Sequence, residues 1–301
     1  MVENSIELKS VHLLLTYKCD GECDHCFVWS SPQAPGTMRL SQVENILKQA
    51  AEVSSVSSVF FEGGEPFLFY PILLKGVGLA RDKGFEVGIV SNAYWAEDAD
   101  DAMLWLKPLA ELGLASLSLS SDDYHGEQES ARRVANASSA AEHLGIDVGV
   151  LRVRRIEDFT KGESSDSDAG DVYFRGRAAV KLTDKVPLVG NPTLISCPEE
   201  PPGISRIHVD AYGNVLFCQG ISIGDMSRTP LKAMVSELSV ESHPFIGPLA
   251  RGGPVALAEE HSIPVEKEYA DACHMCYDIR CKLRAKAMFS DVLCPSQAYG
   301  D

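Results

Sequence analysis

Short apolar runs alternate with longer amphipathic segments through the first half of the chain. The apolar runs predict strands at residues 11–15, 58–62, 85–91, 116–120 and 147–153. The amphipathic segments predict helices at residues 41–51, 71–83, 97–112 and 127–144. This alternation favours β-α units with right-handed crossovers. Short apolar strands fit a parallel sheet covered by helices. A barrel-like or a doubly wound sheet satisfies the pattern, and both place chemistry at the carboxyl ends of the strands.

The pattern changes beyond residue 186. Two short runs, 206–210 and 215–218, flank a turn and predict a β-hairpin. The stretch 243–264 contains several prolines and glycines and is predicted to be a loop, whereas 269–288 is predicted to be helical or turn-helical. We therefore expect two domains: residues 1–185, an α/β domain, and residues 186–301, a smaller domain of a hairpin and a helix.

Composition limits the classes of partner. The chain has 301 residues, is 45% hydrophobic and carries a net charge of −16. Nucleic-acid affinity rests largely on Lys and Arg, so the acidic balance argues against DNA or RNA as the main partner. No apolar run approaches the roughly eighteen residues of a membrane span, and the start of the chain lacks the pattern of a secretory signal. We expect a cytoplasmic protein with no membrane partner.

Nine cysteines in a reducing compartment indicate metal or redox sites rather than disulfides. Three of them, Cys19, Cys23 and Cys26, follow the first predicted strand within eight residues. Three thiolates can hold three irons of a 4Fe-4S cube and leave the fourth iron open to a small molecule. Two other interpretations stay open, a zinc site with His25 as fourth ligand and a chance spacing, although a structural zinc site prefers four closed ligands.

A glycine motif, Gly63-Gly64-Glu65-Pro66, ends the next strand. Glycines there expose backbone polar groups to a ligand at close approach, and Glu65 can hold an ammonium group. The alternative is an ordinary strand-to-helix turn.

Together, the C-x3-C-x2-C spacing after the first strand and GGEP after the second resemble the radical SAM superfamily. The resemblance implies a partial (β/α)6 TIM-like barrel in which Cys19, Cys23 and Cys26 ligate a 4Fe-4S cluster. It further implies that S-adenosylmethionine chelates the open iron and that Gly63 to Glu65 receive its methionyl amino group.

The resemblance also implies further contacts to S-adenosylmethionine. Ser91 and Asn92 end the third strand and Ser120 ends the fourth, where the family places polar contacts to the nucleoside, ribose or carboxylate. Arg132, or Arg133 beside it, is a candidate partner of the methionyl carboxylate. A helix cap or a surface charge explains these residues equally well. His125 has a pKa range suited to acid-base work, but a helix-start histidine that bonds its neighbours is the simpler interpretation.

The remaining cysteines lie in the second predicted domain. C-x15-G-x4-C, formed by Cys197, Gly213 and Cys218, followed by the pair Cys273 and Cys276, resembles the SPASM or shorter twitch extension of radical SAM enzymes, which carries auxiliary 4Fe-4S clusters. The full SPASM pattern has seven cysteines and this region has six. We expect at least one auxiliary cluster, held by these four cysteines. Two others, Cys281 and Cys294, are further ligands, a substrate-facing thiol or plain buried cysteines.

The predicted function follows from these resemblances. An electron from a donor such as flavodoxin or ferredoxin cleaves S-adenosylmethionine to a 5′-deoxyadenosyl radical. This radical abstracts hydrogen from a peptide, protein or small molecule. An auxiliary cluster favours net oxidation of the substrate, such as a cross-link, dehydrogenation or rearrangement. Only eighteen residues precede Cys19, so a separate leader-binding protein or a small substrate is expected. Arg175 and Arg177 orient an anionic substrate group or are structural. The alternatives are a radical SAM activase or cyclase and a non-enzymatic multicluster electron carrier.

Overall fold

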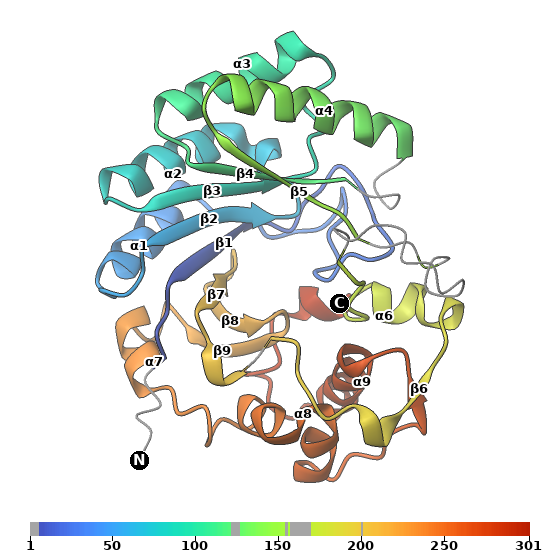
Figure 1. Ribbon diagram of the computed structural model, residues 1–301. Helices are drawn as coiled ribbons and strands as arrows, with labels where there is room; N and C mark the ends of the chain where they lie inside the picture. The colour runs from blue at the N-terminus through green and yellow to red at the C-terminus, as the bar shows by residue number, and fades with distance from the viewer. Residues whose placement is uncertain (1–5, 122–126, 154–155, 157–169, 200) are drawn as a thin grey trace.

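The computed structural model describes residues 6–121, 127–153, 156, 170–199 and 201–301. Its main feature is one eight-stranded sheet with the order β5-β4-β3-β2-β1-β7-β8-β9 (Figure 1). The strands from β5 to β7 in that order are parallel, and β8 and β9 are antiparallel. Their bounds are β1 Ser10–Thr16, β2 Ser58–Gly63, β3 Glu86–Ser91, β4 Ser116–Ser120, β5 Asp147–Leu151, β7 Arg206–Val209, β8 Asn214–Cys218 and β9 Ile221–Asp225.

Four helices connect the first five strands in the predicted strand-helix alternation. They are α1 Leu40–Ala51, α2 Tyr70–Asp82, α3 Ala99–Glu111 and α4 Glu127–His143. Successive side chains of a strand point to opposite faces of the sheet, so only every second side chain faces these helices. In β1, Val11, Leu13 and Leu15 are fully buried in the main core, whereas His12 of the opposite face lines an internal cavity. The parallel sheet therefore has an apolar outer face against the helices and a partly polar inner face.

The chain after β5 returns to the β1 edge of the five-stranded parallel sheet. β7 adds beside β1 and continues into the antiparallel β8, as the predicted hairpin requires. Short helices and strands then lead to two packed helices near the carboxyl end (Figure 1). These elements are α6 Ala178–Lys181, β6 Val189–Gly190, α7 Leu231–Glu237, α8 Ile246–Glu260, β10 Glu268–Tyr269 and α9 Ala272–Ala285, with 3-10 turns η1 Pro66–Phe69, η3 Thr183–Lys185, η4 Asn191–Thr193, η5 Pro201–Gly203 and η6 Ser296–Tyr299.

Two features differ from the sequence prediction. The sixth parallel strand, β7, lies next to β1 rather than next to β5 and is followed by a hairpin, so the described residues do not form six successive β-α units. The segment predicted as a loop contains α8: Gly252 and Gly253 bend it, and Pro254 begins its second half, where a proline is tolerated. In the part of the chain that the structure describes, no helix has the length and apolarity to cross a bilayer.

Candidate functional site

A cavity of about 130 Å³ lies at the carboxyl ends of the first strands. Its wall includes all three cysteines of the first group and both glycines of the GGEP motif. The lining residues are Cys19, Gly21, Cys23, His25, Cys26, Phe27, Val28, Ser30, Glu62, Gly63, Gly64, Val90, Ser91, Asn92 and Ser120. The structure thus brings together segments more than 90 residues apart in the sequence.

A buried arginine holds the cysteine loop in place. Arg177 Nη1 donates to the Cys23 carbonyl at 2.7 Å, its Nη2 donates to the Ser30 carbonyl at 2.7 Å, and its backbone N–H donates to the Cys26 carbonyl. Its side chain is almost fully buried and packs over the Trp29 ring. This arginine fits the structural alternative rather than a contact to substrate. Burial raises the pKa of the Cys19 thiol well above its usual range.

The two glycines are required by the close approach of β2 to the segment that leads into Cys19. A Cβ on Gly63 would lie 2.3 Å from the Thr16 carbonyl oxygen, and one on Gly64 would lie 2.1 Å from that of Lys18. The N–H of Gly64 donates to the Thr16 carbonyl, and the N–H of Glu65 donates to the Lys18 carbonyl. The motif therefore fixes the cysteine loop to the sheet, and it leaves Gly63 and Gly64 on the cavity wall.

Glu65 is fully buried and is not among the residues that line the cavity. Its carboxylate accepts from the N–H of Phe67 at 3.0 Å, from Ser91 Oγ at 3.0 Å and from the N–H of Asn92 at 2.8 Å. Desolvation raises the pKa of Glu65 to about 7, although these donors lower it. Its side chain braces the end of β3, which carries Ser91 and Asn92.

The other predicted contacts divide into two groups. Ser91, Asn92 and Ser120 lie on the cavity wall, and Asn92 Nδ2 donates to Asp20 at 2.6 Å and approaches Cys19 Sγ at 3.7 Å. Arg132 lies outside the cavity lining: it is largely exposed and pairs with Glu97 at 2.7 Å, as Arg133 also does. His125 lies outside the described residues.

The structure places four of the C-terminal cysteines around a second, small cavity. Cys218 ends β8, Cys197 comes from the segment before β7, and Cys273 and Cys276 face it from the first turns of α9, whose N-cap is Asp271. Burial raises the pKa of Cys197 to about 12 and raises the pKa values of Cys273 and Cys276. By contrast, Cys281 and Cys294 do not line this cavity, and Cys294 Sγ contacts Asn214 at 3.3 Å.

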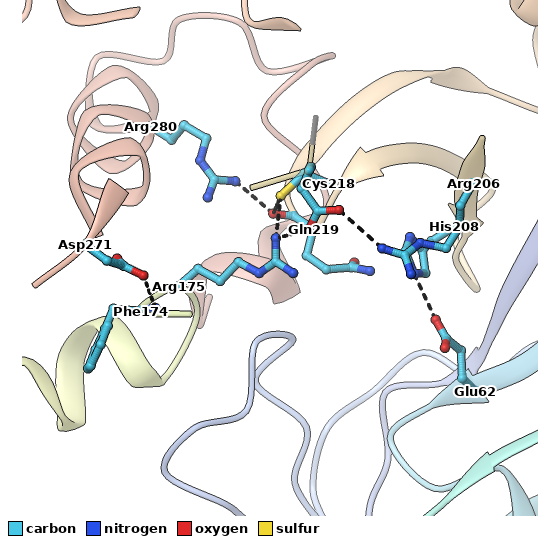
Figure 2. A network of polar contacts seen from close by, with 10 residues as sticks. Glu62, Phe174, Arg175, Arg206, His208, Cys218, Gln219, Asp271 and Arg280 are labelled. Atoms are coloured by element: carbon cyan, nitrogen blue, oxygen red, sulfur yellow. Dashed lines mark hydrogen bonds and ion pairs between the residues drawn. The ribbon is translucent and has the colours of Figure 1, made fainter. Parts of the chain in front are cut away.

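Two arginines line this cavity, the buried Arg280 and the partly buried Arg175, and Figure 2 shows both near Cys218. Arg175 Nη1 donates to Cys218 Sγ at 3.0 Å and to Glu199 at 2.6 Å. Arg280 donates to the Gln219 carbonyl at 2.8 Å and packs over the rings of Tyr277 and Tyr299. Burial alone would lower the pKa of Arg175, but Cys218 and Glu199 raise it well above its usual value. A site of four thiols therefore has a fixed positive charge beside it.

A third, larger cavity of about 400 Å³ occupies the inner face of the sheet. It shares His25, Phe27, Glu62, Val90 and Ser120 with the first cavity and Arg175 with the second. Several of its polar residues, including His12, Glu62 and Arg206, lie at predicted strand positions to which the sequence assigned no functional role. Polar residues at alternate positions of otherwise apolar strands are the signal that would have found them.

Part of the chain, including the residues around the first cavity, matches a known protein family. Residues 13–146 match the radical SAM superfamily. The matched region contains the end of β1, the first cysteine group, the GGEP motif and β2 to β4, and it ends before the C-terminal cysteines.

Curated relatives align with part of the chain. YydG of Bacillus subtilis (strain 168), whose name links it to peptide biosynthesis, is 26% identical over 117 residues, 39% of this chain and 37% of the relative. The tungsten-containing aldehyde ferredoxin oxidoreductase cofactor-modifying protein of Pyrococcus furiosus is 29% identical over 116 residues, 38% of this chain and 31% of that protein. The chain thus spans about a third of the length of these relatives.

Two solved structures with a similar fold contain bound AdoMet. BtrN with AdoMet and 2-DOIA has a TM-score of 0.52 at 17% identity and covers 76% of this chain and 82% of BtrN. The protein anSMEcpe with AdoMet and the Cp18Cys peptide has a TM-score of 0.51 at 13% identity, covering 93% of this chain and 97% of anSMEcpe. These similarities support the α/β fold with a mostly parallel sheet.

Proposed function

We propose that the protein is a radical SAM enzyme that binds a 4Fe-4S cluster through Cys19, Cys23 and Cys26. One observation carries the proposal: these three thiols and both glycines of the GGEP motif line a single cavity at the strand ends, inside the region that matches the superfamily. When bound, the cluster and S-adenosylmethionine supply an electron transfer that gives a 5′-deoxyadenosyl radical able to abstract hydrogen from substrate.

The spacing of the sulfur atoms supports a cluster over a zinc ion. All nine cysteines lie in described parts of the chain, yet no three of their sulfur atoms were found within 4.8 Å of one another. Four thiolates on one zinc ion at about 2.3 Å would stand about 3.8 Å apart. This spacing favours, in both cysteine groups, a cofactor larger than a single zinc ion. In the first group, only three thiols are present, which leaves one position for a small molecule.

The chain's own residues would bind and orient S-adenosylmethionine. Gly63, Gly64, Ser91, Asn92 and Ser120 lie on the wall of the cavity beside the cysteines. The larger cavity shares part of that wall. A substrate held in the larger cavity would therefore lie next to the 5′ carbon of S-adenosylmethionine and be shielded from water. Arg132, paired with Glu97 outside this wall, is not proposed as a ligand.

We assign residues 186–301 to an auxiliary SPASM- or twitch-like domain in which Cys197, Cys218, Cys273 and Cys276 hold one auxiliary 4Fe-4S cluster. Support comes from their convergence on one cavity and from the absence of Cys281 and Cys294 there. The larger cavity reaches this group through Arg175. An electron from a substrate radical would thus have an acceptor nearby, which favours net oxidation.

The substrate is proposed to be a peptide, protein or small molecule that the larger cavity admits. The name of YydG favours a peptide, with a separate leader-binding protein and a flavodoxin or ferredoxin as partners. A second candidate, activation of a glycyl-radical enzyme, is favoured by one relative from Methanocaldococcus jannaschii whose name carries that role and which is 29% identical over 106 residues.

Electron paramagnetic resonance tests the cofactor assignment. Anaerobically reconstituted protein, reduced with dithionite, should show a reduced-cluster signal whose shape changes when S-adenosylmethionine is added. A Cys19→Ala, Cys23→Ala, Cys26→Ala variant should lose the component that responds and keep a second one with about four irons per chain. Loss of all iron in that variant contradicts an independent auxiliary cluster. An unchanged signal with S-adenosylmethionine in the wild type contradicts the first site.

A further inference from the structure

Three side chains of neighbouring strands meet on the inner face of the sheet, and the proposed cofactors do not use them. His12 of β1 lies opposite His208 of the neighbouring strand β7. Glu62 belongs to β2, the strand on the other side of β1. Their ligand atoms all lie within 4.8 Å of one another, in the only such group of three among the residues that the structure describes. Both histidines are buried and Glu62 is nearly so. Figure 2 shows Glu62 directed at His208.

The ligand atoms of this group lie close together, and two of them lack a hydrogen-bond partner. His12 Nδ1 is 3.2 Å from Glu62 Oε2, and His208 Nε2 is 3.0 Å from Glu62 Oε1. Yet His12 Nδ1 and Glu62 Oε1 are both buried and have no hydrogen bond of acceptable geometry. Buried polar atoms nearly always have a partner. Buried ligand atoms that lie this close and lack a hydrogen-bond partner fit an ion held between them.

The distances suit a transition metal. Nitrogen and oxygen ligands at about 2.0–2.2 Å from one ion stand about 3.0–3.5 Å apart, which matches the two contacts. Two imidazoles and one carboxylate are typical of zinc and non-haem iron sites that keep open positions. The His12 ring is fixed by stacking on Phe60 at 4.6 Å. The charge of nearby Arg206 is countered by Glu199 at 3.3 Å.

We propose that His12, Glu62 and His208 form a mononuclear site for a divalent metal of the Zn²⁺ or Fe²⁺ type. Two of its members, His12 and Glu62, line the cavity of about 400 Å³, so the open positions face it. There the ion takes an oxygen or nitrogen donor of the substrate, such as a carboxylate or a peptide carbonyl. This last role rests on the proposed function, whereas metal binding does not.

Zinc binding to the cluster-loaded protein tests the site, because the clusters occupy the thiols that line the two cysteine cavities. After dialysis against buffered Zn²⁺, elemental analysis should find one zinc per chain. X-ray absorption at the zinc edge should show nitrogen and oxygen at about 2.0–2.1 Å and no sulfur at about 2.3 Å. Glu62→Gln and His208→Ala should each lower zinc affinity more than about tenfold, since even outer-shell changes cost 10–100-fold. His143→Ala, on the exposed end of α4, should bind as the wild type does.

Circular dichroism and iron content show whether each variant is folded. If His208→Ala does not fold, His208→Gln takes its place. No zinc in the wild type, a sulfur shell, or unchanged affinity in folded Glu62 and His208 variants overturns the proposal; in those cases the three residues form a hydrogen-bonded network only. Zinc counting is independent of S-adenosylmethionine cleavage. Protein that binds zinc and fails to cleave S-adenosylmethionine supports the metal site and contradicts the proposed function alone.

Discussion

Arg177 is the residue that most directly fixes the geometry of the cysteine loop, since its side chain bonds two loop carbonyls from a buried position. Arg177→Ala leaves both carbonyls without that partner. We expect the free energy of unfolding to fall by about 2–4 kcal/mol and iron at the first site to be lost before iron at the second. Thermal unfolding and iron analysis measure this.

Arg132→Ala is the matched control, because Arg132 is largely exposed and pairs only with Glu97 among the contacts described. Exposed ion pairs contribute about 0–1 kcal/mol. Equal losses of stability and iron in the two arginine variants would show that Arg177 does not hold the loop.

The raised pKa of Glu65 predicts that the stability of the fold depends on pH. Its pKa is raised to about 7 by desolvation, above its value in the unfolded chain, so the folded protein holds a proton that the unfolded chain has released. The stability from this group is complete below about pH 4.5 and is lost as the pH rises through about 7. Infrared spectroscopy should detect a protonated carboxyl band that disappears near pH 7 in the wild type and is missing in Glu65→Gln. A band identical in both proteins would assign the proton elsewhere.

At the scale of elements, the junction of β1 and β2 couples the glycine motif to the cysteine loop. A methyl group on Gly64 would lie 2.1 Å from the Lys18 carbonyl oxygen, a backbone atom that cannot move alone. We expect Gly64→Ala to displace the loop, lower the iron content of the first site and destabilise the fold by more than about 2 kcal/mol. Iron analysis and denaturant unfolding measure both effects.

Gly149→Ala in β5 serves as the control, because nothing lies within 4 Å of its added Cβ. It should keep wild-type iron content. Full iron content in Gly64→Ala would mean that the close approach of the two strands does not position the cysteines.

Local pattern predicted most of the elements, and its failures have physical causes. The strand-helix alternation of β1 to β5 and the hairpin of β7 and β8 match the prediction, because each strand is a short apolar run bounded by turns. The segment of α8 was wrongly predicted as a loop: its glycines and proline sit at a bend between two helical halves. The place of β7 beside β1 depends on pairing across nearly 200 residues, which no local pattern encodes.

At the scale of the whole molecule, three cavities follow one another from the first cysteine group through the inner face of the sheet to the second group. Sequence motifs identified the cysteines and glycines at the ends of this series. They did not identify His12, Glu62 and His208 between them, since these residues meet only through the order of β2, β1 and β7. Nor did they separate Arg175, beside Cys218, from Arg177, under the first loop.

Arg175 connects the larger cavity to the second cysteine group and predicts an electrochemical effect. Its guanidinium donates to Cys218 Sγ at 3.0 Å, and a positive donor at a ligating sulfur stabilises the reduced cluster. Arg175→Met should lower the midpoint potential of the auxiliary cluster by an amount on the order of tens of mV and leave the first cluster unchanged. A redox titration followed by electron paramagnetic resonance measures both. Equal shifts of the two clusters would contradict the assignment.

The formation of 5′-deoxyadenosine tests the central claim most directly. Reconstituted protein, incubated anaerobically with dithionite and S-adenosylmethionine, should produce 5′-deoxyadenosine and methionine in equal amounts. Cys19→Ala should abolish both products, and Cys281→Ala, outside both cysteine-lined cavities, should retain them. No 5′-deoxyadenosine from wild-type protein with its clusters fully loaded would contradict a radical SAM enzyme.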